Sequence, residues 1–524
     1  MKLSLKKALF STSILTALAR VFGFIREVVF LALFGSSQIT DVYLFAFRLT
    51  NLFRQILGES NADSAFMPSF IQLYAKGEKA EAWRLARSIL GYLIIFSIIA
   101  MLSLFFLFPP LAHILAPGFP KETLPKLIWY VKTMIPIIIM LALSAYAGAI
   151  LQAFKRFSPV YFAPALSSIG FILVLYLYKQ KLGDNVLAYA ILTGSLLQMI
   201  FMWIFLVPVS WKAEAFSFGR IKGKVKGLRQ VARLSIPILF STALEKLASQ
   251  VDLLFASLLE VGSITALYSS YRLFHLPFAI VGLTIGKVYL PYLSKDTVEK
   301  DFNFFVKRLN EAIRLNFILL VPVIVFIVML AEQIVNVIYQ RGSFDARASG
   351  MTSFALQCYA PGLLPTGLIA ILSSAFHSNL NTKKPVIAAA IGMALNIIFN
   401  YILMHTFLTY GGLALGTSLA FMFQTALLYI WFREFARKKG VDIMQKDDFK
   451  FLLRLLLVNI LPSLSLIPFY IFFPYDKSII IRASFLIAAS IIFTLFFLAS
   501  GLYLFPIQEI KDSLLSRKDR TDNK

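Results

Sequence analysis

Long apolar runs recur from one end of the chain to the other, and they limit the fold more than any other feature. Each run is about 20 residues long, the length that an α-helix needs to cross a hydrocarbon core of about 30 Å. The 524 residues are 59% hydrophobic and only 15% charged. The runs are continuous, whereas the strands of an outer-membrane barrel alternate apolar and polar residues in segments of ~10. We therefore expect an all-α polytopic membrane protein.

Fourteen stretches are candidates for membrane-spanning helices. The first two contain the most charge, so hydropathy alone supports them least. The stretches lie at about 10–34, 39–58, 87–108, 128–151, 159–178, 186–209, 232–258, 263–292, 315–338, 351–377, 385–406, 411–432, 452–473 and 478–504.

Basic residues gather in every second loop between these spans. If the N-terminus is cytoplasmic, the termini and the loops after even-numbered spans hold most of the 51 Lys and Arg residues, with clusters at 220–233, 295–314 and 433–454. This is the positive-inside pattern of membrane proteins. It predicts an even number of spans with both termini in the cytoplasm. It also explains the net charge of +24 without nucleic acid as a partner.

The connections divide the chain into four parts. The longest basic connection separates two sets of six spans, and each set contains a short basic turn before a proline, at 155–159 and 381–385. These equivalent positions suggest an internal repeat, although turn chemistry alone can also produce them. The expected parts are a first lobe at 1–209, a basic cytoplasmic linker at 210–231, a second lobe at 232–433, and two extra helices with a basic cytoplasmic tail at 434–524.

Charged side chains inside the first two spans are the most costly feature of the sequence. Each Arg or Asp near a helix centre costs roughly 2.5–3.5 kcal/mol on insertion scales. Ion pairs within each span explain some of these charges, because Arg20 with Glu27 and Asp41 with Arg48 are seven residues apart. A water-filled cavity that receives a charged substrate explains the rest. The residues concerned are Arg20, Arg26, Glu27, Asp41, Arg48, Arg54 and Glu59.

A further arginine, Arg272, lies in the eighth span. Guanidinium groups suit phosphate oxygens because they form bidentate hydrogen bonds and keep their charge. Taken alone, Arg272 is also explained by an arginine that reaches the membrane surface or pairs within its helix. The arginines of spans 1, 2 and 8 meet only if both lobes face one cavity. We expect such a cavity and a diphosphate-bearing substrate.

A second polar group combines Asp252, Asn396, Asn400 and Thr417. Asn396 and Asn400 are four residues apart and share a helix face. One carboxylate, two amide oxygens and a hydroxyl suit a small cation such as Na⁺. Hydrogen bonds between helices explain the same residues at least as well.

Sequence motifs for catalysis or ATP hydrolysis are absent. The single cysteine, Cys358, leaves no disulfide framework or thiolate metal site. The glycine-lysine segments at 219–224 and 282–287 lack the spacing and the Ser or Thr of an ATP-binding loop. No loop is long enough for a catalytic domain. The sequence therefore predicts a transporter that is not an enzyme.

Several segments resemble the MurJ/MviN family, the lipid II flippases of bacterial peptidoglycan synthesis. The resemblance covers roughly residues 5–435. The matching segments are ARVFGFIRE (19–27), TDVYLFAFRLTNLFRQILGE (40–59), ILAPGF (114–119), ILQAFKRFSPVYFAP (150–164), YSSYRLFHLPFAIVGLTIGKVYLPYLS (268–294), YQRGSFDA (339–346), TKKPV (382–386) and GGLALGTSLA (411–420).

The resemblance implies a fold similar to MATE-like members of the MOP superfamily. Such a fold has two six-helix lobes around a central cavity, and here two extra helices would form a groove for a polyprenyl tail. The group of Asp252 falls where some members are thought to hold Na⁺. The sequence departs from the family at Ala19, Glu27 and Tyr271, which changes the ion pairs but keeps the arginines. The implied substrate-binding residues are Arg20, Arg26, Arg54, Arg272, Asp41 and Glu59.

The function implied is a flippase that moves lipid II, an undecaprenyl-diphosphate-linked disaccharide pentapeptide, from the inner to the outer leaflet of the bacterial cytoplasmic membrane. Alternating access would be driven by the membrane potential or a cation gradient. The expected partners are lipid II, membrane lipids and the cell-wall synthesis machinery. Alternatives are a MATE-type exporter, disfavoured by an arginine-rich cavity, or a flippase for another polyprenyl-linked glycan. A scaffold or a glycan polymerase is disfavoured by the short outer loops.

Overall fold

The structure is a computed structural model that describes residues 2–54, 66–211, 225–298, 302–379, 381–443, 446–504 and 507. Nearly all of these residues are helical and none is in a strand. Within them, ten helical stretches are long and apolar enough to cross a membrane. The expected all-α, polytopic membrane fold is therefore confirmed.

The chain packs as two units, and the first comprises residues Met1–Ile264. Its buried core includes Phe70, Trp83 and Tyr146, which come from three different helices. Its helices are α1 (Lys2–Phe34), α2 (Gln38–Arg54), α3 (Met67–Ala75), α4 (Lys79–Leu115), α5 (Leu124–Met134), α6 (Ile137–Ala153), α7 (Phe157–Leu182), η3 (Gly183–Asn185), α8 (Val186–Trp211) and α9 (Leu228–Ser257).

The second unit comprises residues Thr265–Lys524. Its core gathers Phe305, Leu372 and Phe432 from three long helices. Its helices are α10 (Ser263–Pro277), η4 (Phe278–Gly282), α11 (Leu283–Val298), α12 (Phe302–Tyr339), α13 (Ala346–Tyr359), η5 (Ala360–Gly362), α14 (Leu363–Ser378), α15 (Lys383–Met404), α16 (Thr409–Lys438), α17 (Lys446–Ile471), α18 (Ile479–Ala499) and η6 (Ser500–Leu504).

The expected spans consist largely of helical residues where the structure describes them, but residues 55–58 of the second span lie outside the described residues. The number of membrane crossings stays a prediction. Helices α1, α2 and α9 are not among the ten apolar stretches, as their internal charges lead us to expect for the first two. Several spans are interrupted. Pro136 separates α5 from α6, and the π-helical turn η4 separates α10 from α11. Such breaks are tolerated where neighbouring helices cover the freed backbone groups.

The division into packed units falls one helix later than the expected lobe boundary at 231/232. Helix α9 groups with the first unit because Val231 packs on Leu85 of α4. At its other end, a Cβ on Gly118 would clash with the backbone of Ser257. The packed units describe which helices share a core. The two lobes, the linker and the extra helices expected from the sequence describe an internal repeat and a transport function instead. This four-part division stays a prediction.

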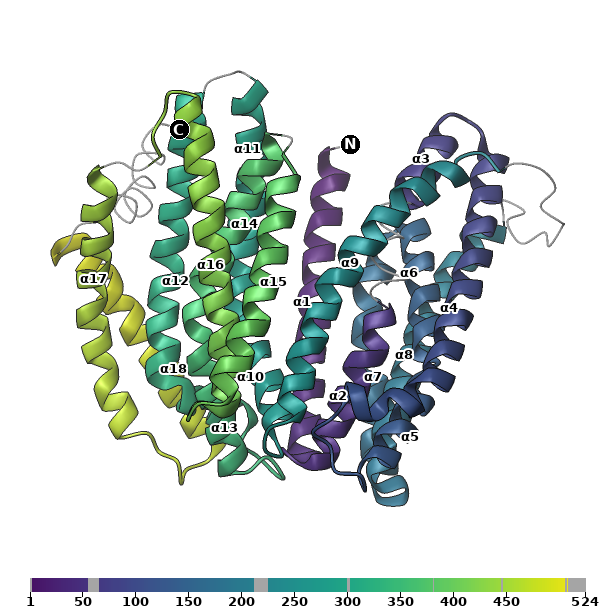
Figure 1. Cartoon of the computed structure of the whole chain (residues 1–524), viewed down its shortest axis with the longest axis horizontal. Coiled ribbons are helices and arrows are strands. Elements are labelled where there is room, and N and C mark those ends of the chain that lie inside the picture. Colours follow the sequence, from purple (N-terminus) through teal and green to yellow (C-terminus); the bar gives the residue numbers. More distant parts are fainter. Residues whose placement is uncertain are drawn as a thin grey trace. The chain divides into compact units, whose positions relative to one another are not determined.

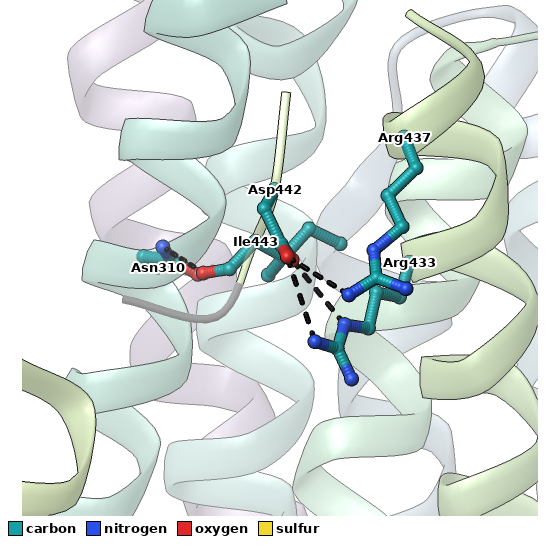
Figure 2. A network of polar contacts seen from close by, with 5 residues as sticks. All are labelled: Asn310, Arg433, Arg437, Asp442 and Ile443. Carbon is teal, nitrogen blue, oxygen red and sulfur yellow. Dashed lines mark hydrogen bonds and ion pairs between the residues drawn. The ribbon is translucent and has the colours of Figure 1, made fainter. Parts of the chain in front are cut away.

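Helices α17 and α18 pack against α12 of the second unit (Figure 1). The segment before α17 is fixed by polar contacts that come from two helices (Figure 2). Arg433 Nε and Arg437 Nη2 of α16 lie 3.2 and 3.0 Å from the carboxylate oxygens of Asp442. Asn310 of α12 donates a hydrogen bond to the Ile443 carbonyl at 3.0 Å. These contacts set where the extra pair of helices begins.

The topology is testable by labelling introduced cysteines, with Cys358 first changed to Ser. We expect Lys477→Cys, in the turn before α18, to react with a membrane-impermeant maleimide in intact cells. Lys226→Cys, before α9, should react only after the membrane is permeabilised, since the basic connections are expected in the cytoplasm. Both lysines are exposed, so access to the reagent decides the result. Labelling of both positions in intact cells would contradict the topology.

Candidate substrate-binding site

Two of the expected arginines, Arg20 and Arg26, lie on α1. Arg20 is exposed and Arg26 is half-buried, with its Cζ 5.6 Å from the centre of the Phe171 ring on α7. Neither guanidinium forms an ion pair within the part of the chain that the structure describes. The alternative of an Arg20–Glu27 ion pair therefore does not apply, and Glu27 is itself buried. Charges without a carboxylate partner in an apolar helix are costly unless water or a ligand meets them.

The surface of α1 between these arginines is open. A Cβ placed on Gly23 would find no heavy atom within 4 Å. Further along the helix, Phe30 packs on Tyr43 of α2 and on Phe171 of α7, with ring centres 5.1 and 6.4 Å apart. The end of α1 near Phe30 is thus held in the core of its unit, while the stretch with Arg20 and Gly23 is left accessible.

Asp41 occupies a different environment from the arginines. Its side chain is buried, and Oδ2 accepts a hydrogen bond from the backbone N–H of Gly262 at 2.6 Å. The hydroxyl of Ser36 donates to the Gly262 carbonyl at 3.2 Å. Gly262 has a φ of 98°, a conformation that favours glycine. Asp41 therefore joins α2 to the turn between α9 and α10.

The remaining expected residues of the second span are only partly described. Arg48 is half-buried on α2. Arg54 ends that helix, but its side chain lies outside the described residues, as does Glu59. The expected roles of Arg54 and Glu59 stay predictions.

Arg272 lies on α10, in the second unit, with its side chain exposed. Its Nη2 donates a hydrogen bond to the Tyr268 hydroxyl at 2.8 Å, and its Cζ lies 5.2 Å from the centre of the same ring. Tyr268 is one helical turn earlier, so it holds the guanidinium against α10. Tyr271 and Phe274 fix the helix by packing on Tyr359, with ring centres 5.5 and 5.6 Å apart.

Three members of the expected cation group meet between α15 and α16. Asn396 donates a hydrogen bond to the Thr417 hydroxyl at 3.1 Å, and Asn400 donates to the Asn396 amide oxygen at 3.3 Å. Thr417 in turn donates to the Leu413 carbonyl at 3.0 Å. Asp252, the only carboxylate of the expected group, is half-buried on α9 in the first unit. Three neutral oxygens suit a weakly held monovalent cation better than a divalent one.

Some contacts of these residues were not foreseen from the sequence. Phe171 lies far from Arg26 along the chain, and nothing in the sequence relates the two. Gly262 acts through its backbone, which carries no sequence signal of its own. The contact of Tyr268 with Arg272 was not foreseen either, although the spacing of four residues places both on the same helix face.

The chain is similar in sequence to known proteins over most of its length. The family profile described as lipid II flippase MurJ matches residues 30–488. A probable lipid II flippase MurJ from Buchnera aphidicola subsp. Schizaphis graminum is 28% identical, with 99% of each chain covered. One from Vibrio cholerae is 29% identical over 80% of this chain and 81% of the relative.

Solved structures show the same fold. A lipid II flippase MurJ in an inward closed conformation is similar with a TM-score of 0.74 and 23% identity, covering 94% of this chain and 98% of the other. An inward-facing multidrug resistance MATE family transporter of the MOP superfamily is similar with a TM-score of 0.67 and 16% identity. That match covers 82% of this chain and 98% of the transporter.

The contact of Asp41 with Gly262 predicts a stability effect. Asp41→Ala should lower the free energy of unfolding by about 1–3 kcal/mol, because it leaves a buried N–H without this acceptor. Asp41→Asn keeps an acceptor oxygen and should lose less. Thermal melting of the purified protein measures both. Asp476→Ala, which removes an exposed carboxylate, is the control. Melting of Asp41→Ala at the wild-type temperature would show that the contact contributes little.

Proposed function

The chain belongs to the lipid II flippase MurJ family, and from this premise we propose that it moves lipid II across the bacterial cytoplasmic membrane. The lipid would pass from the inner to the outer leaflet, where the cell-wall synthesis machinery uses it. The termini would lie in the cytoplasm. Moving a lipid between leaflets makes and breaks no covalent bond, so the proposed activity is transport and not enzymatic.

One observation carries the proposed binding mode: Arg20 and Arg26 share helix α1 and have no acidic partner among the described residues. The diphosphate of lipid II would supply the missing negative charge. Guanidinium groups match its oxygens through paired hydrogen bonds. We assign Arg20, Arg26, Arg54 and Arg272 to this group.

The two acidic residues of the expected set would act differently from the arginines. Because the carboxylate of Asp41 is buried against Gly262, we assign it to holding α2 in place rather than to contact with the diphosphate. Glu59 would balance the charge of Arg54 or bind polar groups of the substrate. The polyprenyl tail would stay in lipid along α17 and α18, whose exposed side chains include apolar ones such as Leu456 and Leu495.

The transport cycle would be an alternating-access movement of the two units. Each unit has its own buried core, so each can move as a body without losing its packing. The empty carrier would be reset by the membrane potential, since moving one charge through 100 mV is worth about 2.3 kcal/mol. The basic residues of α1 and α10 are charges on which that potential can act.

A cation gradient is a second source of energy. The residues Asn396, Asn400 and Thr417 would bind Na⁺ through their oxygens, with Asp252 adding a negative charge in one state of the cycle. Asn396 and Asn400 are buried, which would shield a bound ion from water. A binding site that is complete in only one state couples the ion to the movement.

Rival functions make different demands on the same residues. A MATE-like exporter of organic cations needs acidic groups where this chain has arginines. The positive charge of these arginines therefore disfavours this function. A flippase for another polyprenyl-linked glycan would share the diphosphate and thus the arginines. Direct binding of lipid II compared with undecaprenyl phosphate separates cargo recognition from simple phosphate binding.

Substitution of the arginines tests the binding mode. Arg26→Ala and Arg272→Ala should fail to restore growth of cells depleted of their own lipid II flippase. Purified variants should bind lipid II roughly tenfold to a hundredfold more weakly, because a charge-assisted contact contributes about 1.5–3 kcal/mol. Arg26→Lys should keep part of the affinity, since it retains the charge but loses the planar fork.

Lys438→Ala is the matched control, because this exposed lysine pairs only with the neighbouring Glu434 on the helix surface. It should support growth as the wild type does. Full growth with both Arg26→Ala and Arg272→Ala would count against the proposed role of the arginines.

The cation site is tested by substituting its oxygens. Thr417→Val and Asn400→Ala should abolish any increase in melting temperature that Na⁺ gives over K⁺ at equal ionic strength. Thr425→Val is the control on the same helix, because its hydroxyl donates to the Pro365 carbonyl instead. If Na⁺ and K⁺ stabilise the wild-type protein equally, Na⁺ is not the coupling ion.

A further inference from the structure

Two arginines meet at one end of the second unit, where α12 ends and α18 begins. Arg482 lies in the first turn of α18, and Arg341 lies two residues after the end of α12 at Tyr339. The two helices are packed against each other along their length (Figure 1). This end of the unit corresponds to loops that are expected on the outer side of the membrane.

Neutral groups of α12 hold both side chains in place. Arg482 Nη1 donates a hydrogen bond to the Asn336 amide oxygen at 2.8 Å. Asn336 is buried and its own amide donates to the Gln340 side chain at 2.6 Å. Arg341 Nη2 donates to the backbone carbonyls of residues 337 and 338 at 2.7 and 2.6 Å. The two guanidiniums are thus fixed by a built network and do not simply extend into water.

No carboxylate neutralises this pair within the described residues, because neither arginine forms an ion pair there. Glu332, an acidic residue one turn before Asn336 on α12, interacts with the Tyr475 hydroxyl instead. The Nε atoms of Arg341 and Arg482 are buried and have no acceptor. Burial and the neighbouring charge of Arg482 lower the pKa of Arg341 from its ordinary value.

The position of Arg482 at the N-terminus of α18 is also electrostatically unfavourable. A helix N-terminus carries partial positive charge, so cations are disfavoured there and anions are favoured. The first turn of α18 contains no acidic residue, and its N-cap, Ser478, makes no side-chain capping bond. An anion at this point would interact favourably with both guanidiniums and with the start of α18.

The surroundings identify the chemical class of that anion. Phe472 and Ile480, on either side of the α17–α18 turn, are 72% and 75% exposed. Exposed apolar side chains beside fixed cations suit the boundary between headgroups and acyl chains. We propose that Arg341 and Arg482 form a binding site for the phosphate group of an anionic phospholipid of the outer leaflet. This site uses none of the residues assigned to lipid II.

The bound lipid would anchor the α17–α18 pair to α12 at the membrane surface. Hydrogen bonds from the guanidiniums would hold the phosphate, and the acyl chains would lie against the exposed side chains of Phe472 and Ile480. A ligand that binds only the folded protein raises its melting temperature in a concentration-dependent way. Stability therefore reports occupancy of this site independently of transport.

The experiment titrates the full-length protein in neutral detergent with phosphatidylglycerol, phosphatidylcholine or sodium phosphate and follows the melting temperature. Phosphatidylglycerol should stabilise the wild type more than phosphatidylcholine does. Arg482→Gln and Arg341→Gln should each weaken the apparent affinity for phosphatidylglycerol about tenfold, as expected for one charge-assisted contact. Arg482→Lys keeps the charge and should fall between these variants and the wild type.

Lys477→Gln is the matched control, because it removes an exposed positive charge from the same turn; it should titrate as the wild type does. If sodium phosphate also raises the melting temperature of the wild type, and Arg482→Gln removes this effect, the anion site is supported but its ligand is a soluble phosphate and not a lipid. The proposal is overturned if phosphatidylglycerol does not stabilise the wild type, or if the Arg341 and Arg482 variants respond as Lys477→Gln does.

Discussion

Hydrocarbon offers no hydrogen bonds, and this constraint governs the polar residues of the chain. Most of them find partners inside the protein. Asp41 accepts from the backbone of Gly262, Tyr146 donates to the Ala86 carbonyl, and Ser418 donates to the Cys358 carbonyl of a neighbouring helix. Arg20 and Arg26 on α1 are guanidiniums without an acidic partner among the described residues. An anionic ligand would therefore supply the negative charge that these two side chains lack.

The arginines of α1 differ from those at the end of α12 in how neighbouring groups hold them. On α1 the guanidiniums border an open surface beside Gly23, which suits a substrate that must bind and leave. At the end of α12, Arg341 and Arg482 are fixed by amide and backbone oxygens, which suits a ligand that stays. The difference lies in how firmly neighbouring groups hold each side chain, because a preorganised site loses less entropy when its ligand binds.

Small residues and prolines make the long helices adaptable without exposing their backbones. Gly282 approaches Gly367 closely at the π-helical turn η4, and Gly416 lies against Asn400 between α15 and α16. Close approaches of this kind let polar side chains of one helix meet those of the next. The Asn396–Asn400–Thr417 cluster depends on such a contact. A movement that separates these helices would also take apart the cluster.

Hydropathy and charge in the sequence determined the all-α membrane fold, because crossing hydrocarbon imposes length and polarity on each helix. Helical spacing also placed Asn396 with Asn400. Tertiary structure decided the rest. Only folding brings Phe171 under Arg26, Gly262 to Asp41, α9 into the first unit and Arg482 to Asn336. These contacts join residues distant in sequence, some through backbone atoms, and no local pattern encodes them.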